Sequence, residues 1–178
     1  NQGMLLQMLI QMNQCKRVLE LGTFAAYSTM WLARALPEDG YILTIEGRDT
    51  HAAIGQENID KAQLKQTIEL KCGRAADILK SLPADIEPFD FIFIDADKQS
   101  YPEYLELSLN LSHSGTLIFL DNVIRAGDII NPENHKPSIE GIRDMFKAMQ
   151  NHPKILSCTA LQTVGSKGHD GFALAIVK

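Results

Sequence analysis

The 178-residue sequence has few cysteines, no long apolar run and no excess of basic residues. Cys15, Cys72 and Cys158 are far apart and form no C-x-x-C pair, which disfavours a zinc site and suits a reducing compartment such as the cytoplasm. No apolar stretch approaches the roughly 18 residues of a membrane helix, and no signal peptide is visible. The net charge of −5 argues against a nucleic-acid partner, although it does not exclude a small RNA substrate.

The composition is that of an ordinary globular protein. Hydrophobic residues make up 45% of the chain and charged residues 22%. A chain of this length buries a sizeable core, and no linker or internal repeat divides it. We therefore expect a single domain over residues 1–178. The methionines Met4, Met8 and Met12 recur every four residues, which favours a stripe facing the core.

Strand-like and helix-like segments alternate along the chain, which predicts an α/β fold with a mostly parallel sheet covered on both faces. The last two strands have no helix between them, so one of them is expected to run antiparallel. Expected strands cover 17–22, 41–47, 67–73, 89–96, 115–123, 154–162 and 171–177; expected helices cover 3–13, 26–36, 50–64, 74–82, 101–110 and 138–150. A polar loop is expected over 126–137.

The first strand-to-helix turn, "LELGTFAAYS", predicts a site for a nucleoside with little negative charge. Gly22 is its only glycine, whereas a diphosphate needs several glycines, and Glu20 would repel phosphate. Glu46 closes the second strand, where an acid can accept both ribose hydroxyls. Gly73 and Ala75 follow the third strand and would leave room for adenine. S-adenosylmethionine fits this pattern better than a nicotinamide dinucleotide does.

Carboxylates and a lysine gather where the fourth strand ends, in "FIFIDADKQSYPEYLE". Asp95, Asp97 and Lys98 come directly after the apolar run. Helix capping is the plainer interpretation of the aspartates, but Ser100 and Glu103 already provide a capping box for the next helix.

The fifth strand ends in Asp121-Asn122 and is expected to lie beside the fourth. Together with Asp95, these side chains offer oxygen ligands for a hard cation, Mg²⁺ or Ca²⁺. No histidine or cysteine lies nearby in the sequence, which argues against zinc.

These motifs resemble the cation-dependent O-methyltransferase family that includes the catechol and caffeoyl-CoA O-methyltransferases. The resemblance covers essentially the whole chain, through "RVLELGTFAAYS", "IEGRD", "CGRAADIL", "FIFIDADKQSYPEYLE", "FLDNVIRAGDI" and "GHDGFALAIVK". It implies a Rossmann-like class I methyltransferase fold with a seven-stranded sheet. It also implies methyl transfer from S-adenosylmethionine to a hydroxyl of a catechol-like or caffeoyl-type aromatic, with a divalent cation chelating the vicinal oxygens.

Carried over position by position, the resemblance implies the following site. Lys98 corresponds to the general base, and Asp97 is not expected to bind the metal. The implied metal ligands are Asp95, Asp121 and Asn122. The implied cofactor contacts are Glu20, Gly22, Ser28, Glu46, Ala75 and Asp95. Arg125 and Asn131 are weaker candidates for substrate contacts.

The chain departs from the family pattern at two points. Ala26 stands where the family usually has glycine, and its methyl group would crowd the methionine part of the cofactor. One or two N-terminal helices of the family are also missing. These departures keep open a cofactor-binding module without turnover; a methyltransferase for a hydroxylated RNA base and a nicotinamide-dependent oxidoreductase are further alternatives. A homodimer and no membrane association are expected.

Overall fold

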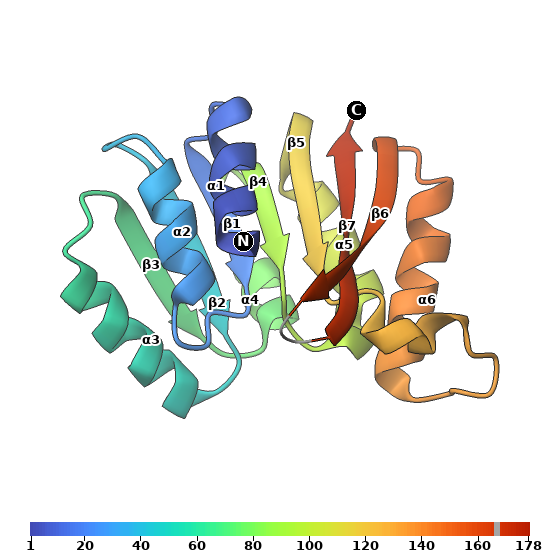
Figure 1. The fold of residues 1–178 in the computed structure, drawn as a ribbon. Coiled ribbons are helices and arrows are strands. Elements are labelled where there is room, and N and C mark those ends of the chain that lie inside the picture. Colours follow the sequence, from blue (N-terminus) through green and yellow to red (C-terminus); the bar gives the residue numbers. More distant parts are fainter. Residues whose placement is uncertain (166–167) are drawn as a thin grey trace. The chain divides into compact units, whose positions relative to one another are not determined.

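A computed structural model describes residues 1–165 and 168–178 of the chain (Figure 1). Its contacts divide the chain into two compact units, Asn1–Ile92 and Phe93–Lys178, and the boundary falls inside strand β4 (Phe89–Ile94). The expectation of a single domain therefore stays a prediction. No helix within the described residues is long and apolar enough to cross a membrane.

The first unit is a parallel βαβ arrangement. β1 pairs with β2, and β2 pairs with β3, both in parallel register. In Figure 1, α2 lies in front of these strands and α4 lies behind them, so both faces are covered. The elements before β4 are α1 (Gln2–Met12), β1 (Arg17–Leu21), α2 (Tyr27–Ala35), β2 (Tyr41–Glu46), α3 (Asp49–Ala62), β3 (Thr67–Cys72) and α4 (Ala75–Ser81).

The expectation that the methionine stripe of α1 faces the core is wrong. Met4, Met8 and Met12 are 50%, 51% and 74% exposed, whereas Leu6 and Ile10 are buried. An α-helix presents one face to its neighbour, and residues four apart share that face. The leucine and isoleucine form the buried stripe here, so the methionines lie to its side.

The second unit is built around an antiparallel ladder. β7 pairs antiparallel with both β5 and β6. Phe119 of β5 stacks on Phe172 of β7 with ring centroids 4.5 Å apart, and Phe93 packs 5.5 Å from Phe119. After β4 the elements are the 3₁₀ helix η1 (Lys98–Ser100), α5 (Tyr101–Asn110), β5 (Ser112–Asp121), the 3₁₀ helix η2 (Arg125–Ile130), α6 (Pro137–Gln150), β6 (Ile155–Gly165) and β7 (Gly168–Val177).

The strand order β3-β2-β1-β4-β5-β7-β6 confirms the predicted fold class. Seven strands form a mixed sheet in which β7 is antiparallel. The short apolar strands β1, β2 and β4 are buried almost throughout, as strands covered on both faces should be.

Two segments differ from the expected pattern. The polar loop expected over 126–137 contains η2, which consists of two short helical turns interrupted by a kink at Ala126 and Gly127, whose φ values are 57° and 89°. Strands β6 and β7 also reach further into the expected "GSKGHDG" connection, up to Gly165 and from Gly168. Residues 166 and 167 of that connection lie outside the described residues.

Candidate functional site

The ends of β4 and β5 are joined by the phenol of Tyr101. Its hydroxyl lies 3.0 Å from the carbonyl oxygen of Ile94 and 2.7 Å from that of Asp121, in position to donate to either. Asp95 directly follows Ile94, and Asn122 directly follows Asp121. The buried phenol thus holds together the two chain segments from which the predicted metal ligands project.

The charges of both predicted carboxylate ligands act on the buried phenol of Tyr101. Burial raises the pKa of this phenol well above its ordinary value, and the charges of Asp95 and Asp121 raise it further. Asp170 adds to the rise and Arg125 opposes it. Both predicted carboxylate ligands therefore act on one buried group.

The donor set of Asp95, Asp121 and Asn122 fits a hard cation. Asp121 is 9% exposed, and its Oδ1 accepts the backbone N–H of Asn122 at 2.8 Å. The described residues contain no group of three or more His, Cys, Asp or Glu placed to hold a metal ion, and here the third oxygen comes from an amide. Two carboxylates and one amide suit Mg²⁺, which keeps several waters, better than Ca²⁺, which takes six to eight oxygens.

Lys98 is fixed beside this donor set. Its side chain is 9% exposed, and Nζ lies 2.6 Å from Oδ1 of Asp95 and 4.9 Å from the centre of the Tyr101 ring. Gly141 of α6 packs against the backbone of η1, since a Cβ there would lie 2.6 Å from Cα of Gln99. The predicted base is thus in direct contact with a predicted metal ligand.

Asp97 is held by a different partner. The hydroxyl of Tyr104 donates to Oδ1 of Asp97 at 2.5 Å. Tyr104 belongs to α5, so this bond anchors the DADK segment to the helix that follows it. The expectation that Asp97 is not a metal ligand stays a prediction.

Ser100 is the N-cap of α5, as the predicted capping box requires, but the predicted hydrogen bond from its side chain is wrong. An N-cap serine normally has an extended backbone, whereas Ser100 has φ −92° and ψ 4° because η1 leads directly into the helix. Its side chain makes no capping hydrogen bond. The capping box therefore no longer supports the assignment of the aspartates as metal ligands. That assignment rests instead on the ends of β4 and β5, which lie together at the Tyr101 hydroxyl.

The segment after Asn122 is held at its beginning by β7. Oδ1 of Asp170 accepts the backbone N–H groups of Ile124 at 3.2 Å and Arg125 at 3.0 Å. The carbonyl of Gly171 accepts the N–H of Val123 at 3.0 Å. Three successive amides of the segment are thus bound by two adjacent residues of one strand.

Arg143 of α6 holds the other end of this segment. Its Nε donates to the carbonyl of Ile129 at 2.9 Å, and Nη1 donates to the carbonyl of Asn134 at 2.9 Å. Nη2 also donates to the carbonyl of Asn131. The side chains of Arg125 and Asn131, the weaker substrate candidates, are exposed.

In the first unit, the carboxylate of Glu46 is positioned at the end of β2. Its Oε2 accepts the N–H of Phe24 at 2.9 Å, and its Oε1 accepts the N–H of Arg48 at 3.0 Å. His51 lies 3.6 Å from Oε1 and packs edge-on against the Phe24 ring at 4.8 Å. Backbone donors thus fix the carboxylate, and the ribose-binding role of Glu46 stays a prediction.

Glu20 lies in a buried cluster of hydroxyl groups. Its Oε2 accepts hydrogen bonds from Thr29 at 2.5 Å and from Thr44 at 2.6 Å, and Thr23 lies 2.6 Å from Thr44. The side chain is 0% exposed. This network ties β1, β2 and α2 together, and the cofactor role of Glu20 stays a prediction.

The turn after β1 has a backbone conformation that requires glycine. Gly22 has φ 102° and donates its N–H to Ile45 at 2.8 Å. Ala26, where the resemblance leads us to expect glycine, is buried and has a left-handed backbone at φ 60° and ψ 25°, a conformation that glycine adopts without strain. Ser28 is half-buried in the first turn of α2, and Ala75 is buried at the start of α4.

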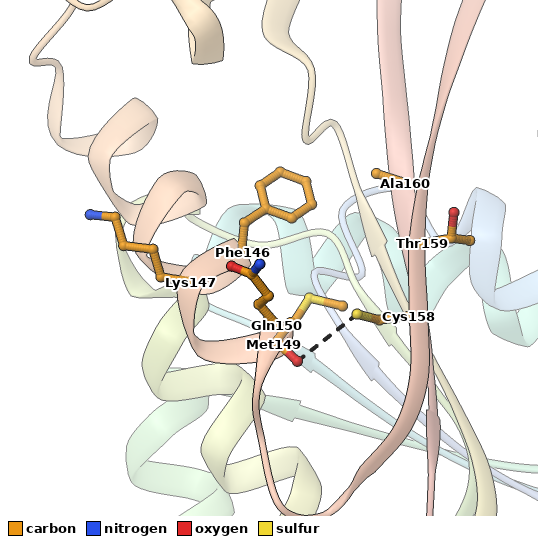
Figure 2. Close-up of a pocket in the computed structure, with 7 residues that line it drawn as sticks. All are labelled: Phe146, Lys147, Met149, Gln150, Cys158, Thr159 and Ala160. Atoms are coloured by element: carbon orange, nitrogen blue, oxygen red, sulfur yellow. Dashed lines mark hydrogen bonds between the residues drawn. The ribbon is translucent and has the colours of Figure 1, made fainter.

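A groove of about 370 Å³ lies elsewhere, between α6 and β6 (Figure 2). Sγ of Cys158 lies 3.9 Å from the carbonyl oxygen of Met149 across it. None of the predicted site residues lines this groove. Its lining residues are Phe146, Lys147, Met149, Gln150, Cys158, Thr159 and Ala160.

Sequence reasoning missed the contributions of Tyr101 and Asp170. Tyr101 directly follows the DADKQS segment, so its proximity to the strand end was the available signal. Asp170 bonds to residues 45 and 46 positions earlier in the chain, and periodicity gives no signal for such a contact.

Comparisons with known proteins test the predicted resemblance. A family model described as O-methyltransferase matches residues 1–175, in agreement with the predicted resemblance. A catechol O-methyltransferase of Niastella koreensis is 49% identical over 100% of this chain and 80% of its own length. A catechol O-methyltransferase of Mycobacterium tuberculosis is 40% identical over 99% of this chain and 79% of its own.

Solved structures give the same result. The crystal structure of an O-methyltransferase from Bacillus cereus in complex with SAH is 47% identical and superposes with a TM-score of 0.95. It covers 99% of this chain, which covers 80% of it. The O-methyltransferase TomG from Streptomyces achromogenes, in complex with SAM, is 39% identical with a TM-score of 0.95, covering 99% of this chain and 79% of its own.

Proposed function

Because the chain belongs to the O-methyltransferase family, we propose that it transfers a methyl group from S-adenosylmethionine to one hydroxyl of a catechol-like aromatic, with Mg²⁺ as cofactor. The observation that carries the proposal is the position of the Tyr101 hydroxyl, which lies 3.0 Å from the carbonyl of Ile94 and 2.7 Å from that of Asp121, beside the Asp95–Lys98 ion pair. The similar catechol O-methyltransferases support the substrate class.

The oxygens of Asp95, Asp121 and Asn122 would hold the cation. Bound there, a divalent cation supplies Lewis-acid chemistry, which lowers the pKa of a phenolic hydroxyl and orients two vicinal oxygens. Tyr101 keeps the two ligand-bearing segments together through its bonds to Ile94 and Asp121. This arrangement favours a substrate with two adjacent oxygens over a simple phenol.

Lys98 is the proposed general base. S-adenosylmethionine, when bound, would supply an electrophilic methyl group on its sulfonium. Nζ of Lys98, in its neutral amine form, would accept the proton that the substrate hydroxyl gives up. Asp95 now binds the Lys98 ammonium at 2.6 Å, so a cation and Lys98 compete for the charge of one carboxylate. A bound cation would repel the ammonium and favour loss of its proton to solvent, which would leave the neutral amine that a general base requires.

The first unit would bind the nucleoside part of the cofactor. Glu46, fixed by the N–H groups of Phe24 and Arg48, would accept the ribose hydroxyls. Gly22, Ser28 and Ala75 lie at the start of the helices that follow β1 and β3, or in the turns before them. Glu46→Gln should weaken S-adenosylmethionine binding in calorimetry about tenfold or more, because a neutral amide is a poorer acceptor for two hydroxyls.

The proposal is tested by a methyl-transfer assay with catechol, caffeate, an acyl-CoA phenol and RNA as acceptors. A methylated catechol is expected, with product lost on chelation and restored by Mg²⁺. Asp95→Ala should abolish the metal-dependent product, whereas Asp144→Ala, at an exposed carboxylate of α6, should leave it unchanged. Product formation that continues in the presence of the chelator would refute the metal role. Methylation of RNA without methylation of any aromatic acceptor would refute the substrate class.

We further propose that the chain forms a homodimer in the cytoplasm. β6 ends the strand order, carries no charged residue, and ten of its eleven residues are exposed. Such an edge can pair with a second strand, and a two-fold dimer would cover both edges at once. The three free thiols suit a reducing compartment. Light scattering should give a dimer, and Thr159→Lys on β6 should give a monomer; a monomeric parent would exclude the assembly.

A further inference from the structure

We propose that Asp170 is a positioning residue that fixes the metal-ligand segment through its backbone. The proposal rests on the metal site proposed above and assigns a task to a side chain outside it. Asp170 lies in β7, one residue before Gly171, and neither belongs to the predicted ligand set.

The backbone around the ligands is strained and needs outside support. Asn122, Arg125 and Ala126 have positive φ values of 55°, 53° and 57°, and Gly127 has φ 89°. A left-handed backbone costs roughly 1 to 2 kcal/mol at a residue other than glycine or asparagine, so Arg125 and Ala126 keep it only when surrounding contacts stabilise them. Asn122, the remaining residue, is a predicted metal ligand.

Asp170 supplies that support with one carboxylate oxygen. Oδ1 accepts the N–H groups of Ile124, Arg125 and its own neighbour Gly171, at 3.2, 3.0 and 2.9 Å. Hydrogen bonds to an ionised acceptor are stronger than neutral ones. The carboxylate therefore binds residues 124 and 125 to β7, directly after Val123 and the proposed ligand Asn122.

Gly171 permits this close approach. A Cβ at Gly171 would lie 2.5 Å from Cγ1 of Ile124 and even closer to the carbonyl oxygen of Leu161 on β6, so a larger residue would disturb both the β6 ladder and the segment. The Gly171 carbonyl also accepts the N–H of Val123 at 3.0 Å. The Asp170-Gly171 pair thus binds residues 123–125 and limits how far Asn122 can move.

The alternative is that Asp170 only stabilises the fold, and metal affinity separates the two roles. We would measure Mn²⁺ binding by calorimetry in the absence of substrate, SAH binding without metal, and amide hydrogen exchange at Ile124 and Arg125 by NMR. The variants are Asp170→Ala, which removes the acceptor, Asp170→Asn, which keeps a neutral one, and the control Asp144→Ala at an exposed carboxylate of α6.

Asp170→Ala should bind Mn²⁺ at least tenfold more weakly and exchange both amides at least tenfold faster, with SAH affinity unchanged. Asp170→Asn should recover most of the Mn²⁺ affinity, and Asp144→Ala should match the parent chain. Parent-like Mn²⁺ affinity in Asp170→Ala would overturn the proposal, even if the amides exchange faster.

Asp170→Glu provides a second test in case Asp170→Ala does not fold. It keeps the charge but moves the carboxylate by one methylene, so weakened Mn²⁺ binding is expected and undiminished affinity would overturn the proposal. A parent chain that binds SAH but no Mn²⁺ would instead refute the metal site. Failure of the proposed function can therefore be distinguished from failure of the role proposed for Asp170.

Discussion

The ammonium of Lys98 lies 2.6 Å from Oδ1 of Asp95, so the proposed base and a proposed metal ligand form an ion pair. The lysine is largely buried, and its nitrogen also faces the Tyr101 ring. One carboxylate thus serves two cationic partners, and removing one of them should affect binding of the other.

Lys98→Met should separate proton transfer from metal binding. The variant keeps a long side chain but removes the charge that competes for Asp95, so Mn²⁺ affinity should stay equal or rise. Methyl transfer should fall by about 10²- to 10⁴-fold, the usual contribution of a general base. Calorimetry and a labelled-methyl assay measure the two effects; Lys147→Met, at an exposed lysine paired with Asp144, is the control. Unchanged turnover would remove Lys98 from the mechanism.

Tyr101→Phe should destabilise the protein at neutral pH. The carbonyls of Ile94 and Asp121 would lose their phenolic donor in a buried position, which costs about 1 to 3 kcal/mol. Urea unfolding at pH 7 measures this loss. A variant as stable as the parent chain would mean that the carbonyls find other donors.

The same residue predicts an alkaline dependence of stability. The folded-state pKa of Tyr101 is raised well above 10 by burial and by Asp95 and Asp121, so the folded state favours the neutral phenol. Its contribution is complete below the unfolded-state pKa of about 10 and is lost as pH rises above it. Between pH 9 and 11 the parent chain should therefore lose more stability than Tyr101→Phe does, and parallel pH profiles would contradict this.

Gly141→Ala should disturb the segment that carries Lys98. The new methyl group would lie 2.6 Å from Cα of Gln99 and even closer to the Lys98 carbonyl, and these backbone atoms cannot rotate away. We expect a loss of about 1 to 3 kcal/mol in unfolding free energy, despite the better helix propensity of alanine. Gly47→Ala is the control, because no atom lies within 4 Å of its new methyl group.

The three cysteines should react with iodoacetamide at different rates. Burial, with a smaller effect of Asp90, raises the pKa of Cys15 to about 12, and the thiolate is the reactive form. The exposed Cys72 donates to Asp49 at 3.0 Å, which raises its pKa. In the Thr159→Lys variant at pH 8, which is expected to leave the β6 edge open, mass spectrometry should detect alkylation of Cys158 first, then Cys72, and none at Cys15. Early modification of Cys15 would reveal opening of the first unit.

The sequence was most informative where a local pattern determines the structure. The apolar run Phe89–Ile94 forms a buried strand as expected, and α5 covers the expected residues 101–110. The capping bond of Ser100 failed because the preceding 3₁₀ turn fixes its backbone, and the sequence pattern does not report that turn.

Contacts between distant segments account for the rest. The Tyr101 bond to Asp121 spans 20 residues, and the Asp170 bond to Arg125 spans 45. The exposed methionines of α1 could not be anticipated either, since two stripes of similar hydrophobicity compete on one helix. Which stripe is buried depends on packing outside the helix.

The left-handed backbone at Asn122 has a consequence for charge balance. Among residues other than glycine, asparagine and aspartate adopt positive φ most readily, and both offer an oxygen. Asparagine contributes no charge, so the two carboxylates and one amide of the proposed ligand set carry −2, which a bound divalent cation would neutralise. A catecholate oxygen would then approach an electrically balanced centre, whereas aspartate at position 122 would leave that centre negative and repel the nucleophile.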